Sequence, residues 1–247
     1  LLAALEATGG LVRVGSEVDL KDELDTQVLT AAARESILAR FATLDDETTA
    51  MLRTASSLGA SFTTEELAVV LDRPVAAVVD PLGRATRAGL VEPGATNWSF
   101  RHELFHEAIE STIAAPLRAP LQLAIARRLT AAGAAPERVV AHYLLGAQPG
   151  DTDAVVVLRT VASRIAGQSP AAASQLLERA LDLLSSTAEE RDDITVELIE
   201  MLMWSGELER AGDWVTQALT RALPPELEAR VHESAARASS SGGSARV

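Results

Sequence analysis

The sequence contains no cysteine, which excludes a disulfide framework, a thiol nucleophile and any metal site built on cysteine. No stretch approaches the roughly 18 uninterrupted apolar residues of a membrane-spanning helix, and no basic-then-apolar leader stands at the start. The phosphate-binding motif G-x-x-x-x-G-K-S/T is also missing, so the chain has no phosphate-binding loop of its own. These absences exclude a membrane span, and we expect a cytoplasmic protein.

Positive charge is scarce. Lysine and arginine together number 22 against 35 aspartates and glutamates, and the formal net charge is -13. A surface this acidic repels phosphate backbones and anionic lipids. We therefore expect no direct contact with nucleic acid and none with a membrane.

The chain does have enough apolar material for a core. Its 247 residues are 47% hydrophobic, and at about 150 residues per domain this length suits one large domain or two modest ones. Most segments have the period of a helix. Near the start, residues 2–7 suggest a short helix, and residues 11–20 alternate as one or two short strands would.

The next segment predicts a winged-helix unit. Asp45 or Asp46 caps a first helix, and the acidic turn at Thr63 begins a second. Pro74 opens a third helix, which we expect Pro81 to interrupt. The expected helices and the hairpin after them cover residues 46–58, 63–71, 74–82 and 90–100. Three helices followed by a hairpin is the layout of a winged helix.

A winged helix often binds DNA through its third helix. Here that helix carries Arg84 and Arg87, and two arginines are a thin basic footprint in so acidic a chain. We therefore interpret the unit as an internal docking module.

The remainder predicts a helical array with an internal repeat. The pattern Ala173, Leu177, Ala180, Leu181 recurs 38 residues later as Ala211, Val215, Ala218, Leu219. Small residues alternating with larger apolar ones let paired helices pack closely, as in tetratricopeptide arrays, whose repeat is about 34 residues. The fold class is therefore mainly α: a winged-helix unit with a small β-hairpin, followed by a tetratricopeptide-like solenoid.

Residues 102–106 read His-Glu-Leu-Phe-His and match the zinc-hydrolase pattern H-E-x-x-H. On a helix, His102 and His106 would lie one turn apart and could bind zinc, with Glu103 as the general base. A third ligand is needed. Ile109 stands where the metzincin extension places glycine, and a glutamate such as Glu137 stays open as the third ligand. Zinc hydrolysis is therefore an alternative hypothesis, as is a plain helical-repeat scaffold without a switch.

Longer stretches point elsewhere. Residues 100–104 read Phe-Arg-His-Glu-Leu, and Glu-Ala follows at residues 107–108. This phrase resembles the winged-helix module of the signal-transduction ATPases called STAND NTPases, above all the large ATP-binding LuxR-type transcriptional regulators of bacteria. The segments at residues 52–62, 139–147 and 177–184 resemble, in the same order, that family's helix entering the winged helix, its Ala-His-Tyr helix and its repeat helices.

The resemblance implies a regulatory part of a longer protein and not an enzyme. The ATPase core would precede Leu1 and bind ATP or ADP, the DNA-binding domain would follow Val247, and this chain would hold no cofactor. Related STAND proteins have a Met-His-Asp phrase whose histidine contacts the phosphate of ADP. His102 is its counterpart, and Arg101 replaces the methionine, so either side chain or both would face the phosphate.

In this interpretation the winged helix docks on the protein's own nucleotide-binding domain, and the helical repeats bind an unknown inducer or partner protein. The aromatic candidates for that groove are Tyr143, Trp204 and Trp214. His102 has a simpler alternative role, in which it caps its own helix or bonds a carbonyl. The expected divisions are residues 1–33 as the tail of an ATPase lid, 34–115 as the winged helix, 116–238 as the helical repeats and 239–247 as a flexible tail.

Overall fold

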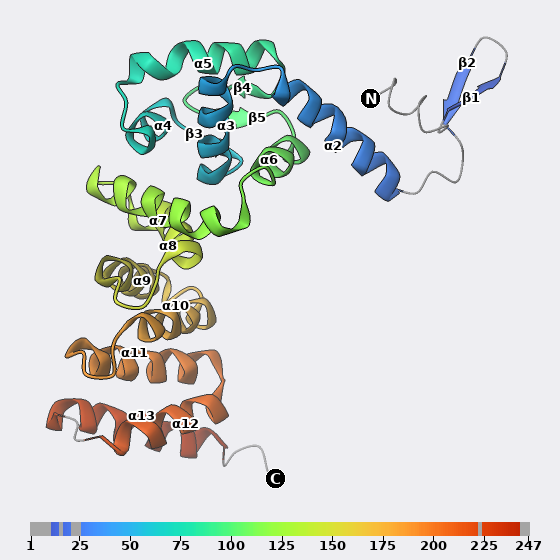
Figure 1. The fold of residues 1–247 in the computed structure, drawn as a ribbon. Helices are drawn as coiled ribbons and strands as arrows, with labels where there is room; N and C mark the ends of the chain where they lie inside the picture. The colour runs from blue at the N-terminus through green and yellow to red at the C-terminus, as the bar shows by residue number, and fades with distance from the viewer. Residues whose placement is uncertain (1–10, 15–16, 21–25, 222–223, 243–247) are drawn as a thin grey trace. The chain divides into compact units, whose positions relative to one another are not determined.

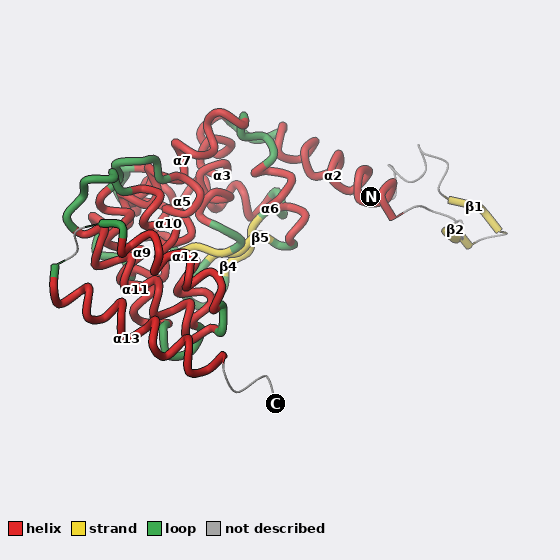
Figure 2. Tube along the Cα trace, turned by 90° about the horizontal axis from the view of Figure 1, so that it is seen from below, coloured by secondary structure: helices red, strands yellow, loops and turns green. Residues whose placement is uncertain are grey.

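The computed structural model describes residues 11–14, 17–20, 26–221 and 224–242. The expected helix at residues 2–7 and the end of the expected tail lie outside the described residues. The structure confirms the mainly α fold class, with twelve helices within the described residues and two small sheets. Figure 2 shows helix throughout, with the strands confined to the N-terminal hairpin and the sheet of the winged helix. Within the described residues, no helix is both long enough and apolar enough to span a membrane.

The chain divides into two compact units, Leu1–Leu121 and Gln122–Val247, and helix α7 (Ala115–Ala131) contributes to both. Unit 1 begins with an antiparallel hairpin, in which β1 (Leu11–Val14) pairs with β2 (Glu17–Leu20). Helix α2 (Thr26–Ala42) follows. Residues 11–20, expected to hold one or two short strands, thus hold two.

A winged-helix unit follows α2 in Figure 1. Its elements, in chain order, are α3 (Asp46–Leu58), β3 (Ser61–Phe62), α4 (Thr64–Leu71), α5 (Val75–Arg87), β4 (Val91–Pro93), β5 (Trp98–Phe100) and α6 (Glu103–Glu110). The three strands pair antiparallel in the order β3-β5-β4, with Phe62 opposite Trp98 and Val91 opposite Phe100. The helices cover this sheet around a core of large apolar side chains, which includes Leu52, Phe62, Leu67, Leu82, Leu90 and Ile109.

The helix boundaries follow from local chemistry. Asp45 caps α3 by accepting a hydrogen bond from the amide of Thr48, and Gly59 ends the helix at a φ of 121°. Thr63 and Glu66 form a reciprocal capping box at the start of α4. Both starts were predicted from the sequence, because side chains that satisfy the unpaired amides of a first turn are recognisable without tertiary information.

Pro81 does not interrupt its helix, contrary to the expectation. Helix α5 continues through it to Arg87. Pro81 removes one intrahelical hydrogen bond, but its ring and the neighbouring side chains of Val78, Leu82 and Ala85 are buried. Burial of this apolar face offsets the lost bond.

Unit 2 is a succession of helices in which each packs on the next from α8 to α13. The helices after α7 are α8 (Pro136–Gly146), α9 (Thr152–Ile165), α10 (Pro170–Leu183), α11 (Glu190–Ser205), α12 (Leu208–Leu219) and α13 (Pro225–Gly242). The first copy of the repeat is buried at all four positions, in α10. In the second copy, Ala211 and Ala218 are buried but Leu219 is 40% exposed, because α12 ends there.

Candidate functional site

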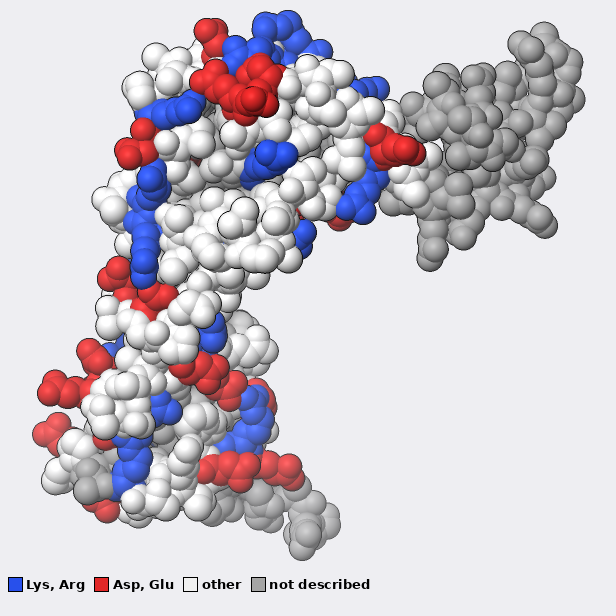
Figure 3. All heavy atoms as spheres, in the orientation of Figure 1, with Lys and Arg blue, Asp and Glu red and all other residues white. Residues whose placement is uncertain are grey.

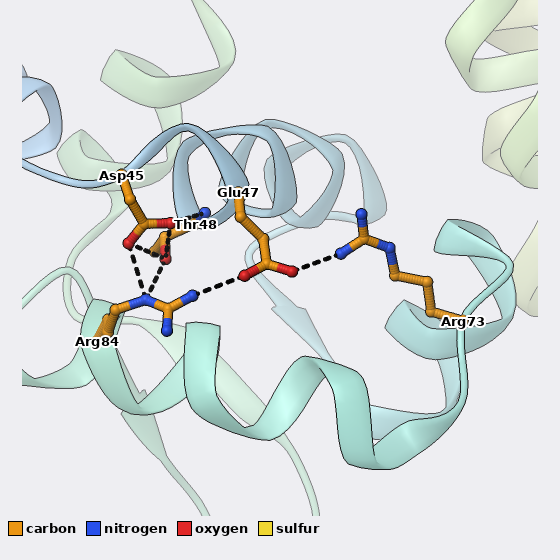
Figure 4. Close-up of polar contacts among 5 residues, drawn as sticks. All are labelled: Asp45, Glu47, Thr48, Arg73 and Arg84. Carbon is orange, nitrogen blue, oxygen red and sulfur yellow. Dashed lines mark hydrogen bonds and ion pairs between the residues drawn. The ribbon is translucent and has the colours of Figure 1, made fainter.

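Of the two arginines on the third helix of the winged helix, Arg87 is exposed and Arg84 is engaged with side chains of the preceding helices. In Figure 4, Arg84 of α5 points at the start of α3. Its Nε lies 2.7 Å from the Oγ1 of Thr48 and 2.8 Å from the Oδ2 of Asp45. Its Nη2 donates to Glu47 at 3.0 Å, and Glu47 also accepts from Arg73 at 2.9 Å. Arg84 is therefore a structural residue that ties α5 to α3.

The exposed side of α5 is largely apolar. Val75 and Val79, one turn apart, are 44% and 55% exposed, and Arg87 is the exposed cation near the end of the helix. A DNA-reading helix needs several cations and hydrogen-bonding side chains. The exposed face of α5 does not offer this set of side chains.

The turn between β5 and α6 is open to solvent. His102 is the N-cap of α6, where its Nδ1 accepts a hydrogen bond from the amide of Leu104 at 3.2 Å. Because Nδ1 is an acceptor, the proton of the neutral ring is on Nε2. His102 and Arg101 are both exposed, and among the described residues Arg101 has one loose ion pair, 3.8 Å from Glu92. The simpler expectation, that His102 caps its helix, is confirmed, and the cap leaves Nε2–H as a donor.

The turn lies at the edge of a groove between α2 and α6. The groove has a volume of about 380 Å³, and its walls are largely apolar. They come from Ala33, Ser36, Ile37, Arg40, Arg101, His102, Leu104 and Phe105. Arg40 was not singled out in the sequence, because nothing local connects it with a turn sixty residues away. Its position depends on the packing of α2 against α6.

The geometry does not favour the zinc-hydrolase alternative. His102 precedes the helix, with extended backbone angles, and its Nδ1 is engaged. The Nε2 of His106 lies 2.7 Å from the carbonyl oxygen of Ser56, and its Nδ1 faces Glu103 at 3.4 Å. Within the described residues, no group of three histidine, aspartate or glutamate side chains is arranged to hold a metal ion. His106 instead joins α6 to α3 through the Ser56 carbonyl.

In unit 2 a second groove of about 530 Å³ lies against α9, α10 and α11. It is crossed by a bidentate ion pair in which Arg159 of α9 donates to Glu197 of α11, with Nη2 to Oε1 at 2.6 Å. This pair raises the pKa of Arg159 through the hydrogen bond to Glu197. Two more residues at the groove form ion pairs: Arg164 pairs with Glu137, and Glu200 pairs with Arg230. Of these residues, only Glu137 was named from the sequence, as a possible zinc ligand; the others resemble ordinary solvated positions there.

The three aromatic side chains predicted to line a groove differ in how far they are buried. The prediction that Tyr143 lines an open groove is wrong, since Tyr143 is 0% exposed and its hydroxyl lies 3.3 Å from the Oγ1 of Thr130. The helical period of the apolar residues predicted that Tyr143 lies on an apolar face, but it could not show that this face is buried in the core. Trp204 is 61% exposed on α11. Trp214 is half-buried on α12, against a small core that includes Val196 and Ile199. Neither tryptophan belongs to the walls of the 530 Å³ groove.

No family model matches the chain, and no curated protein matches its sequence. A solved structure similar to it is that of a Signal Transduction ATPase with Numerous Domains (STAND) protein with a tetratricopeptide repeat sensor from Pyrococcus horikoshii. The two are 14% identical, with a TM-score of 0.42, and the match covers 81% of this chain and 34% of that one. The chain thus spans about a third of the length of the structure that it matches.

Proposed function

We propose that the chain is the regulatory region of a STAND-type switch protein of the ATP-binding LuxR class. In this proposal, unit 1 docks on a nucleotide-binding domain through its β5–α6 turn, and unit 2 binds an inducer or partner protein. The chain itself performs no catalysis. ATP or ADP is held by the neighbouring domain, and Arg101 and His102 face its phosphate.

The observation that carries the proposal is the state of the β5–α6 turn. The N-cap bond fixes the imidazole of His102 and leaves Nε2–H as a donor, and Arg101 stands beside it in solvent. Donors of this kind bind phosphate oxygens strongly, because charge-assisted hydrogen bonds are about twice as strong as neutral ones. The sequence phrase that these residues share with the family supplies the identity of the ligand.

Two further observations support a protein-docking rather than a DNA-reading role. Arg84 is held by carboxylates of α3, and the exposed face of α5 carries Val75 and Val79. In Figure 3 basic and acidic side chains alternate over the visible face of unit 2, without a broad field of one sign. Such a surface suits a protein or small-molecule partner better than a polyanion.

The test is made in the longer protein. His102→Ala is expected to speed the loss of bound ADP and to raise basal activity, because the docked, inactive state loses a phosphate contact. His232→Ala removes another exposed histidine, one that lies 3.7 Å from Glu228 in α13, and serves as the matched control. ADP retention and basal activity that are the same in both variants would remove the docking role.

A further inference from the structure

We infer that Arg40 of α2 belongs to the same anion site as Arg101, and that the two guanidinium groups together take one phosphate group. The inference deepens the proposed function and rests on it for the identity of the β5–α6 turn as a phosphate contact. It adds a residue that the family phrase does not contain, and it makes α2 part of the nucleotide-sensing surface.

Gly89 reveals how the two arginines converge. The point where a Cβ of residue 89 would lie is 3.7 Å from the Nη1 of Arg101 and 3.9 Å from the Nη1 of Arg40. Gly89 also has a φ of 70°, in the region that favours glycine. The two cationic groups therefore flank one small space, which any longer side chain at residue 89 would enter.

The two arginines are poorly neutralised by the protein. Within the described residues, Arg40 forms no ion pair and its guanidinium no hydrogen bond, and Arg101 has Glu92 at 3.8 Å. Both side chains are exposed, and the neighbouring His102 adds the Nε2–H donor. Two guanidinium groups that flank one small space repel each other, and an anion between them relieves that repulsion. Phosphate suits this arrangement, because its oxygens accept from several N–H groups at once.

The groove beside the arginines defines the rest of the ligand. Its walls are mainly apolar, with Ile37 from α2 and Leu104 and Phe105 from α6. An apolar wall ending in cations fits a phosphate carried on a larger body, such as a nucleoside diphosphate, better than a free ion. Because Arg40 comes from α2 and Arg101 from the β5–α6 turn, a bound phosphate would hold these two elements together.

A pair of substitutions at residue 89 tests the convergence. Aspartate and asparagine both tolerate a left-handed backbone. Gly89→Asp places a carboxylate between the two guanidinium groups, whereas Gly89→Asn places a neutral group of the same shape there. The 247-residue chain is titrated calorimetrically, at low ionic strength, with ADP, inorganic pyrophosphate and adenosine.

ADP and pyrophosphate are expected to bind the wild-type chain, and adenosine is expected not to bind it. Gly89→Asn fills the same space without a charge, so it should bind ADP more tightly than Gly89→Asp does. Gly89→Asp and Arg40→Gln should each weaken ADP binding by about tenfold. Arg73→Gln is the matched control, because it removes the same charge from an arginine that is paired with Glu47. It should change ADP binding by less than about twofold. Adenosine that binds as tightly as ADP, or Gly89→Asp that binds ADP like Gly89→Asn, would overturn the inference.

The outcomes also separate this inference from the proposed function. If Arg40→Gln binds ADP like the wild type while Arg101→Gln and His102→Ala do not, the phosphate contact of the turn stands and Arg40 is not part of it. If all three variants and the wild type behave alike, both ideas fail. Circular dichroism of each variant shows whether its fold is intact.

Discussion

Arginine serves two purposes in the two units. In unit 2, Arg159 and Arg164 each bind a glutamate of another helix, and in unit 1 Arg84 does the same between α5 and α3. Arg40 and Arg101 instead converge on one groove, where, among the described residues, Arg101 has a loose ion pair with Glu92 at 3.8 Å and Arg40 has none. Acidic residues outnumber basic ones by 35 to 22, so a carboxylate partner is statistically easy to find. Two adjoining arginines that lack a close partner therefore mark a place for an external anion, whereas the paired ones hold helices together.

The largest effect is expected from the interior of unit 2. Tyr143→Ala should lower the free energy of unfolding by about 3–5 kcal/mol, because it empties a fully buried site. Trp204→Ala, at a side chain that is 61% exposed, should change it by less than about 0.5 kcal/mol. Urea unfolding followed by far-ultraviolet circular dichroism checks both. Comparable losses in the two variants would show that Trp204 is also a core residue.

A smaller effect is expected for the arginine that joins α5 to α3. Arg84→Gln removes a cation from two carboxylates and from the buried hydroxyl of Thr48, and should cost about 1–2 kcal/mol of unfolding free energy. Arg87→Gln, on the same helix and exposed, is the matched control and should cost less than about 0.5 kcal/mol. Equal midpoints of thermal unfolding would mean that the Arg84 contacts contribute no stability.

The sequence could predict features that depend on neighbouring residues, but not those that depend on how distant elements pack. Caps such as Asp45 and Thr63 are local signals, and they gave the helix starts of the winged helix. The turn at His102 was found because its residues are contiguous. Arg40 was missed because its meaning depends on which turn α2 packs against. Tyr143 was misplaced because helical period identifies an apolar face without saying what covers it.

Low pH should lower the stability of unit 1, because Asp45 becomes protonated. The hydrogen bond from the amide of Thr48, with further contributions from its hydroxyl and from Arg84, holds the pKa of Asp45 below its usual value of 3.8. A carboxyl with a depressed pKa stabilises the fold above the unfolded-state pKa and loses that contribution as pH falls through the folded-state pKa. The temperature of the unfolding midpoint of unit 1 should therefore decrease as the pH is lowered below about 4. This decrease should be less steep in Asp45→Asn. Parallel pH curves for the two proteins would exclude Asp45 as a source of this dependence.

The smallest expected change is the most informative about the groove. Arg40→Gln should leave the free energy of unfolding within about 0.5 kcal/mol of the wild type, and any change should be a gain, because the substitution relieves repulsion from Arg101. Added pyrophosphate should then raise the melting temperature of the wild type more than that of Arg40→Gln, since a ligand that binds only the folded state stabilises it more at a given concentration the more tightly it binds. A clear loss of stability in Arg40→Gln without ligand would mean that this arginine is a structural tie like Arg84. The distinction between paired and open arginines would then not hold in unit 1.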